Sequence, residues 1–163
     1  MPAFPDAGLL GLISDTHGLL REEAVAALRG CDLILLAGDV GDAAILSRLR
    51  DIAPVVAIRG NVDTEVWADR WPATEVVAAA GVQIYMLHDV NRLDLTPEAA
   101  GFDVVLSGHS HQPGQVVRRG VLYVNPGSAG PRRFTLPISV AKLDLQARPL
   151  RAEIIALAIG ERR

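Results

Sequence analysis

Five short apolar segments alternate along this chain with polar turns, and each ends abruptly. They are residues 9–13, 33–37, 54–58, 82–87 and 104–107. Continuous apolar runs of this length are typical of strands that are buried on both faces. Residues 19–28 place apolar side chains at helical spacing, and residues 42–50 begin with an aspartate that can cap a helix. The first sixty residues therefore predict alternating strands and helices, which implies parallel pairing with right-handed crossovers.

Beyond Pro72 the pattern changes from strand–helix alternation to hairpins. We expect hairpins at 75–79 with 82–87 and at 115–118 with 121–124, and a final strand pair at 138–145 and 150–159. Short helical turns are expected at 63–69 and 96–100, and residues 1–7 are expected to be a lead-in without regular structure. The two halves together predict an α/β fold in which two mixed sheets pack together with helices outside.

The bulk properties exclude several classes of protein. The chain has 163 residues, which fits one domain over 1–163. No apolar run approaches the roughly 20 residues that a membrane helix needs. A net charge of −3 with dispersed basic residues gives no nucleic-acid-binding patch. The N-terminus lacks a basic signal region, and Cys31 is the only cysteine, so we expect a cytoplasmic protein without disulfides.

Polar side chains with metal-binding chemistry follow each of the five apolar segments. The candidate ligands include all four histidines of the chain and are Asp15, His17, Asp39, Asn61, His88, His109 and His111. Open α/β sheets bind ligands beyond the carboxyl ends of their strands. The sequence therefore predicts a metal site that is assembled from strand ends.

The types of ligand indicate which metals suit this site. Carboxylate, amide and imidazole groups without thiolates favour Mn²⁺, Fe, Zn²⁺ or Ni²⁺ over Ca²⁺ or a structural zinc site. Seven ligands are too many for one catalytic ion that keeps an open position. Two ions about 3.5–4 Å apart could use all seven, with one bridging carboxylate and a hydroxide between the metals. Such a pair would neutralise the charge of a phosphoryl transition state.

Taken one at a time, these residues have simpler interpretations. His88 alone fits a hydrogen-bonded buried histidine, and His109 with His111 fits the polar face of an edge strand. Asp63 is better explained as a structural cap than as a ligand. The coincidence of all the candidates at successive strand ends favours the metal site.

The ordered set of motifs resembles that of the calcineurin-like metallophosphoesterases. The matching residues are Asp15-x-His17, Gly38-Asp39, Gly60-Asn61-x-Asp63, His88 and Gly108-His109-Ser110-His111. The segments 14–18 and 59–61, and Asn125-Pro126-Gly127-Ser128 with Pro131-Arg132, resemble the small bacterial and archaeal phosphodiesterase branch of this superfamily. That branch also contains the eukaryotic retromer subunit Vps29. The resemblance covers residues 8–133.

This resemblance implies a four-layer αββα sandwich of two mixed sheets flanked by helices, with a binuclear metal centre. It assigns the first metal to Asp15, His17, Asp39 and His111, the second to Asn61, His88 and His109, and the bridging position to Asp39. It implies a metal-dependent phosphodiesterase that acts through a metal-bridging hydroxide, with Mn²⁺ favoured over Fe, Zn²⁺ or Ni²⁺. The catalytic residues are then Asp39, Asn61 and His88.

The resemblance also indicates how substrate is held. Asn61 and Arg132 are expected to contact the phosphate, the arginine bidentately, together with N–H groups of the loop at 125–128. That loop could instead be only a turn. Trp67, Trp71 and Phe134 are expected to pack at the roots of loops rather than to stack on a base.

Two positions depart from the superfamily pattern. Val62 stands where many relatives carry a histidine after Gly-Asn, and the small branch usually has cysteine there. Asp89-Val90 follows His88 where Gly-His is common. The expected partner is a small phosphodiester substrate, with no nucleic acid and no membrane, and a homo-oligomer is left open. The alternative function is a Vps29-like protein-binding scaffold without turnover.

Overall fold

The computed structural model describes residues 1–159, which form two mixed sheets packed face to face. The six-stranded sheet contains, in spatial order, β1 (Ala3–Phe4), β5 (Thr74–Ala79), β6 (Val82–Leu87), β7 (Val104–Leu106), β9 (Val121–Asn125) and β8 (Gly114–Arg118). The five-stranded sheet contains β11 (Ala152–Ala156), β10 (Ser139–Asp144), β2 (Leu9–Ile13), β3 (Leu33–Ala37) and β4 (Val55–Ile58). In the second sheet β2, β3 and β4 are parallel, and β10 runs antiparallel to β2.

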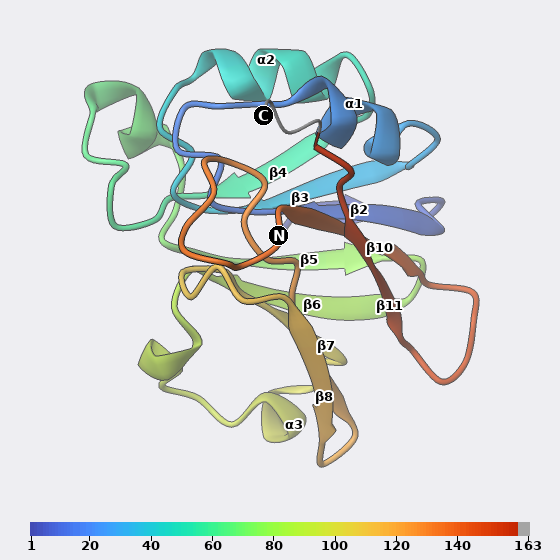
Figure 1. Cartoon of the computed structure of the whole chain (residues 1–163). Helices are drawn as coiled ribbons and strands as arrows, with labels where there is room; N and C mark the ends of the chain where they lie inside the picture. The colour runs from blue at the N-terminus through green and yellow to red at the C-terminus, as the bar shows by residue number, and fades with distance from the viewer. Residues whose placement is uncertain (160–163) are drawn as a thin grey trace.

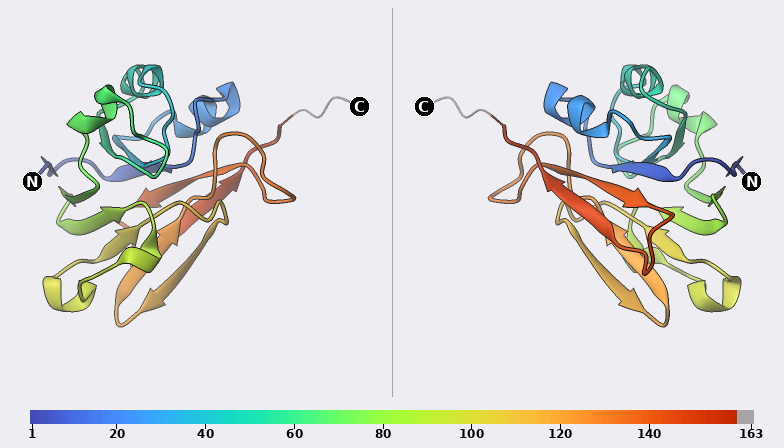
Figure 2. Two further views of the ribbon diagram at one scale, coloured as in Figure 1. Left: turned by 90° about the vertical axis from the view of Figure 1, so that its left-hand side faces the viewer. Right: turned by 90° about the vertical axis from the view of Figure 1, so that its right-hand side faces the viewer.

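Helices cover the outer faces of both sheets. The longer ones, α1 (Glu22–Leu28) and α2 (Ala44–Arg50), lie over the five-stranded sheet, at the top of Figure 1. The short α3 (Pro97–Ala100) and the 3₁₀ helix η2 (Val90–Arg92) lie beyond the six-stranded sheet, and a second 3₁₀ helix, η1, spans Val66–Arg70. Figure 2 shows the resulting order of helices, sheet, sheet and helices from the side. The four-layer αββα arrangement that the sequence predicted is therefore confirmed.

The alternation of side chains along β3 explains how the layers hold together. Leu33 and Leu35 point into the core between the sheets, and Ile34 and Leu36 point into the core under the helices. All four are fully buried. Such a strand has no polar face, because both of its faces are covered. The helical layer beyond the six-stranded sheet is thin, and it closes over a smaller cluster around Tyr85 and Val105.

Most of the predicted elements are present, and the differences are local. The helix expected from residue 19 begins at Glu22, because Leu20 is buried in the helical core and its carbonyl accepts a hydrogen bond from Arg48 at 3.1 Å. The expected helical turn at 63–69 is the 3₁₀ helix η1. The expectation of an irregular lead-in at residues 1–7 was wrong in one respect, since this segment contains β1, which pairs in parallel with β5. No helix in residues 1–159 has the length and apolar character needed to cross a membrane.

Candidate metal centre

The loops after five strands bring the predicted ligands together at one end of the sandwich. These loops follow β2 (Asp15 and His17), β3 (Asp39), β4 (Asn61), β6 (His88) and β7 (His109 and His111). Three of the strands belong to one sheet and two to the other. The candidate site therefore lies across the seam between the two sheets.

Six of these side chains form two groups that could each hold a metal ion. Within each group the ligand atoms lie within 4.8 Å of one another. The first group is Asp15, His17 and His111, and the second is Asp39, His88 and His109. Both groups combine one carboxylate with two imidazoles, which is the type of ligand set that suits a divalent transition metal.

The two carboxylates lie between the groups. Oδ1 of Asp15 is 3.4 Å from Nε2 of His111 and 3.7 Å from Nε2 of both His17 and His88. Oδ2 of Asp39 is 3.1 Å from Nε2 of His88 and 3.7 Å from that of His17. Bridging by Asp39 stays a prediction, and Asp15 has a comparable position.

Asn61 and Asp89 lie at the exposed end of the second group. The Asn61 amide nitrogen is 3.3 Å from Nδ1 of His109, and Nε2 of His109 is 3.8 Å from the Asp89 carboxylate. Asn61 therefore lies next to the second group, and its role as a ligand stays a prediction. Sequence reasoning noted Asp89 as part of a departure from the family motif and did not include it among the candidate ligands. Its position directly after His88 was the available signal.

Several buried polar atoms of the two groups have no hydrogen-bond partner in the described part of the chain. They are Oδ1 of Asp15, Nε2 of His88 and Nδ1 of His111. A buried polar atom without a partner costs about 1–3 kcal/mol, and two of these three atoms point at other candidate ligands. The residues present therefore fit divalent cations.

His88 shows how the chain orients one of these donors. Its Nδ1 is 2.7 Å from the carbonyl oxygen of Ala37, so Nδ1 carries the proton and donates it there. Nε2 is then left as a lone-pair donor that faces Asp39, which is the usual arrangement for a metal-binding histidine. The interpretation of His88 as a hydrogen-bonded buried histidine explains the contact of Nδ1 and does not explain why Nε2 faces Asp39.

The pKa shifts of Asp39 and His111 favour cation binding, whereas that of His88 opposes it until a cation displaces its proton. Burial raises the pKa of the Asp39 carboxyl, but the His88 side chain, the N–H of Val62 and the charges of His88 and His17 outweigh burial and lower the pKa to about 2. Burial lowers the pKa of His88, and its contacts with Asp39 and the Ala37 carbonyl raise it overall. Burial lowers the pKa of His111, with Asp15 opposing. At neutral pH the Asp39 carboxyl group is therefore anionic, as a metal ligand must be.

The backbone is strained at most of the candidate ligands. Five of them have positive φ angles between 46° and 72°, namely Asp15, His17, Asp39, His109 and His111. Residues other than glycine in this region cost about 1–3 kcal/mol each, and they cluster at functional sites. His109 and His111 lie in a loop beyond the end of β7, so their interpretation as one face of an edge strand was wrong.

Glycines allow the strand ends to approach each other closely. A Cβ atom at Gly60 would lie 2.2 Å from Oδ1 of Asp39, and one at Gly108 would lie 2.1 Å from Oγ of Ser14. These distances are far shorter than any real contact between such atoms. The glycines of the Gly-Asn and Gly-His motifs are therefore required by the packing of neighbouring loops.

Asp63 connects two of the ligand-bearing loops. Its buried carboxylate accepts hydrogen bonds from the N–H groups of Val40, Gly41 and Gly60 at 2.8–3.1 Å. Val40 and Gly41 follow Asp39, and Gly60 precedes Asn61. Asp63 therefore has the structural role expected for it, although it ties two loops together rather than capping one helix.

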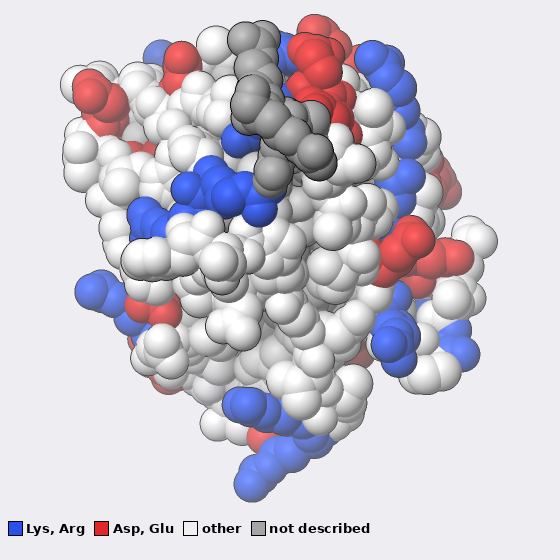
Figure 3. All heavy atoms as spheres, in the orientation of Figure 1, with Lys and Arg blue, Asp and Glu red and all other residues white. Residues whose placement is uncertain are grey.

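Arg132 and Arg133 lie beside the first group. Together with His17, His111 and Pro131 they line a cleft of about 260 Å³. In the face drawn in Figure 3, basic side chains gather over the loop between β9 and β10, which contains both arginines. This cleft could receive an anion, and the contact between Arg132 and phosphate stays a prediction.

The loop after Asn125 uses its N–H groups within the protein. Gly127 N–H donates to Asn125, Ala129 N–H to the carbonyl of Ser14, and Gly130 N–H to the hydroxyl of Ser128. The expectation that N–H groups of the loop at 125–128 meet phosphate is therefore wrong for Gly127, and Ala129 and Gly130 just beyond this loop also use their N–H groups within the protein. Their partners are the turn itself and the end of β2.

The three aromatic residues at the loops differ from one another. Trp67 and Trp71 meet edge to face, with ring centroids 4.8 Å apart, and pack against the helical core as expected. Phe134 is 86% exposed and has a φ of 53°. The expectation that Phe134 packs at a loop root is therefore wrong, because a ring with this exposure has little to pack against.

Comparison with known proteins supports the same chemistry. Residues 9–148 match the model of the calcineurin-like phosphoesterase superfamily domain. A probable metallophosphoesterase of Methanothermobacter thermautotrophicus is 33% identical over 90% of this chain and 91% of its own length. Phosphodiesterase YfcE of Escherichia coli is 29% identical over 80% of this chain and 84% of its own.

A solved structure shares the fold over nearly the whole chain. The crystal structure of Chaetomium thermophilum Vps29 has a TM-score of 0.76 and 25% identity, and the match covers 90% of this chain and 86% of that one. The fold of this chain is thus known from an experimental structure.

Proposed function

This chain belongs to the calcineurin-like phosphoesterase superfamily, and on that premise we propose that it is a phosphodiesterase with a binuclear metal centre. The observation that carries the proposal is the pair of ligand groups described above, each with one carboxylate and two imidazoles. When bound, two divalent ions would supply an activated water and neutralise charge on the phosphoryl group. Mn²⁺ is the metal we favour, with Fe, Zn²⁺ and Ni²⁺ as alternatives.

The residues have distinct roles in this proposal. Asp15, His17, Asp39 and His111 hold the first ion, Asn61, His88 and His109 hold the second, and Asp39 is shared. Asn61 and Arg132 orient the phosphate. The similarity to the Escherichia coli phosphodiesterase supports a diester substrate. A diester also carries less negative charge than a monoester, and so needs fewer cationic contacts.

The likeness to Vps29 supports one alternative, a protein-binding scaffold without turnover. Loss of candidate ligands would favour it, and here every predicted ligand residue is present. We therefore favour the phosphodiesterase over the protein-binding scaffold.

The proposal is tested by removing metal from the protein and restoring one metal at a time. Bound metal is counted by elemental analysis, and hydrolysis of bis(p-nitrophenyl) phosphate is compared with that of p-nitrophenyl phosphate. Asp39→Asn should bind less metal and lose turnover. The matched control is Asp42→Asn, since Asp42 is exposed and only accepts the N–H of Ala44 at 2.9 Å. Full metal content without hydrolysis of either ester would favour the scaffold.

A further inference from the structure

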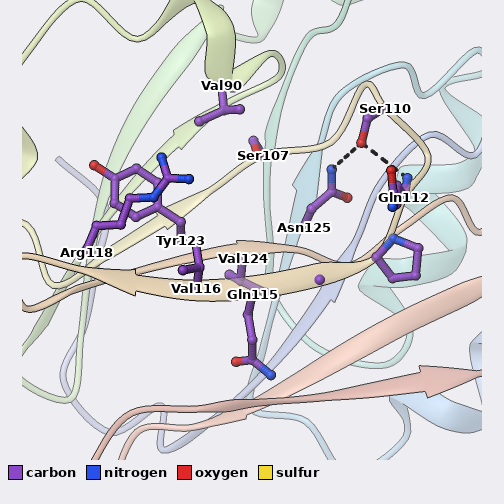
Figure 4. A pocket seen from close by; sticks show the side chains of 12 residues that line it. Val90, Ser107, Ser110, Gln112, Gln115, Val116, Arg118, Tyr123, Val124 and Asn125 are labelled. Carbon is purple, nitrogen blue, oxygen red and sulfur yellow. Dashed lines mark hydrogen bonds between the residues drawn. The ribbon is translucent and has the colours of Figure 1, made fainter.

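A second cleft lies beside the candidate metal centre, between the β8–β9 hairpin and η2. Its volume is about 520 Å³, within the range of about 300–1,000 Å³ that is usual for small-molecule sites. Figure 4 shows Ser110 and Asn125 at one end, and Tyr123, Val116, Arg118 and Val90 toward the other. None of these six side chains belongs to the predicted ligand set.

The cleft begins next to the candidate ligands. Ser110 separates His109 from His111, and Val90 follows His88 by two positions. Because consecutive Cα atoms are about 3.8 Å apart, the backbone of the cleft wall starts within one or two residues of the metal groups. A ligand could therefore occupy the cleft and the metal centre together.

The end near the metal groups presents one hydrogen-bond donor. The hydroxyl oxygen of Ser110 accepts from Nδ2 of Asn125 at 3.1 Å and from the N–H of Gln112 at 3.2 Å. Asn125 is held in place, because it also donates to the Gly108 carbonyl at 2.9 Å and accepts from Gly127 at 2.9 Å. A hydroxyl has two acceptor sites and one donor. With both acceptor sites used, the exposed Ser110 is left to donate its proton to an acceptor atom of a ligand.

The other end combines apolar side chains with one aromatic ring and one guanidinium group. The guanidinium carbon of Arg118 lies 5.7 Å from the centre of the Tyr123 ring. Val116, which is directly opposite Tyr123 in the β8–β9 ladder, is 45% exposed, and Val90 is 38% exposed. Aromatic and apolar walls with a few polar groups at one end are typical of sites for ring-bearing ligands.

The neighbouring clefts have different chemistry. The cleft lined by His17, His111, Arg132 and Arg133 has no aromatic wall and suits an anionic group. A third cleft, of about 370 Å³, includes Tyr85, but that residue is only 8% exposed, and charged side chains such as Arg59 and Asp89 also line the cleft. The β8–β9 cleft has fewer charged groups and a more exposed aromatic residue, Tyr123. These differences favour the β8–β9 cleft for an uncharged ring.

We propose that this cleft binds the ring-bearing ester group of the phosphodiester substrate, a nucleoside-like group. Its planar ring packs against Val116 and Val90 beside the Arg118–Tyr123 pair, and one of its oxygen atoms accepts the Ser110 proton. The inference rests on the proposed function, since it places the phosphate at the metal centre and one ester arm in the cleft.

The test compares two exposed valines that are adjacent on β8. Val116 lines the cleft, and Val117, which is 60% exposed, points to the opposite face of the strand. Val116→Trp fills the cleft, and Val117→Trp is the matched control. Both positions are exposed, so equal melting temperatures are expected and would show that both variants fold.

Binding of thymidine 5′-monophosphate and of methyl phosphate is measured by titration calorimetry on the metal-reconstituted protein. The wild type should bind the nucleotide at least about tenfold more tightly than methyl phosphate, because ring burial adds affinity. Val116→Trp should remove that preference and leave methyl phosphate binding unchanged. Val117→Trp should keep it. Equal affinities of the wild type for the two compounds, or equal effects of the two variants, would overturn the proposal.

A second measurement does not depend on the variants or on bound metal. Thymidine is titrated into metal-free wild-type protein, and backbone amide shifts are followed by NMR. Shifts should concentrate in 110–118 and 121–125, and shifts confined to other segments would contradict the inference. Hydrolysis of bis(p-nitrophenyl) phosphate separates the two claims. Turnover without a preference for the nucleotide would overturn only the proposal for the cleft. A preference for the nucleotide without turnover would support the proposal for the cleft and overturn the proposed enzymatic function.

Discussion

Replacing Asp63 by asparagine should destabilise the protein strongly, although Asp63 is not a predicted metal ligand. Its carboxylate is 4% exposed and accepts from three N–H groups, with Val40 shared between both oxygens, Gly41 on Oδ1 and Gly60 on Oδ2. An asparagine keeps one oxygen and turns an N–H₂ group toward at least one of these donors.

The magnitude follows from that geometry. Hydrogen bonds to a charged group contribute about 1.5–3 kcal/mol each, and a buried N–H without a partner costs about 1–3 kcal/mol. With one or two donors left unpaired, we expect a loss of about 3–5 kcal/mol in the free energy of unfolding. For a domain of this size that corresponds to a fall of roughly 6–20 °C in melting temperature.

Urea and thermal unfolding of metal-free protein measure this loss directly. Asp32→Asn is the matched control, because one oxygen of the exposed Asp32 accepts both Gly8 and Leu9, at 3.1 and 2.8 Å. Asparagine can keep that oxygen in place, so the control should lose no more than about 1 kcal/mol. A loss below about 1 kcal/mol for Asp63→Asn, or equal losses for both variants, would refute the reasoning.

Three further predictions concern the arginine cleft, the strained phenylalanine and the cysteine. Arg132→Ala should lower kcat/KM for bis(p-nitrophenyl) phosphate by about 10- to 150-fold, the range for one hydrogen bond to a charged group. Arg119→Ala, at a position with 82% side-chain exposure, should change kcat/KM little. Equal effects of the two variants would show that Arg132 does not contact the substrate. Phe134→Asn should raise the melting temperature or leave it unchanged, since asparagine tolerates a positive φ and the exposed ring buries little surface. A clear fall in the melting temperature would show that the ring packs against the protein. Burial raises the pKa of the Cys31 thiol. At mildly alkaline pH a disulfide reagent should therefore modify the native protein far more slowly than the urea-unfolded protein. Equal rates of modification would contradict the burial of Cys31.

The sequence predicted the parts of the site that depend on local pattern. A buried run that stops at Asp15, Asp39 or His88 identifies the end of a strand, and parallel strands place their carboxyl ends together. The order of the strands was not accessible in the same way. The pairing of Ala3 and Phe4 with β5 joins segments more than seventy residues apart, and a two-residue strand has no periodicity to recognise.

Contacts between loops were also beyond the sequence pattern. Asp63 reaches Val40 only because β3 and β4 are neighbours in the sheet. The cleft beside Ser110 needs both the β8–β9 hairpin and η2, and η2 was not predicted. Alternation along a strand could assign Val116 and Val117 to opposite faces, but not decide which face borders the metal groups.

The left-handed backbone at the candidate ligands needs support from the strands and loops around it. Five such residues, at about 1–3 kcal/mol each, together cost an amount comparable with the net stability of a whole domain, about 5–15 kcal/mol. A loop held at one end could relax out of this geometry. Here each ligand-bearing loop leaves a buried strand and is tied to a neighbouring loop, as Asp63 ties the loops of Asp39 and Asn61. The strain is therefore sustained by the cores of both sheets, which hold the donor atoms close together.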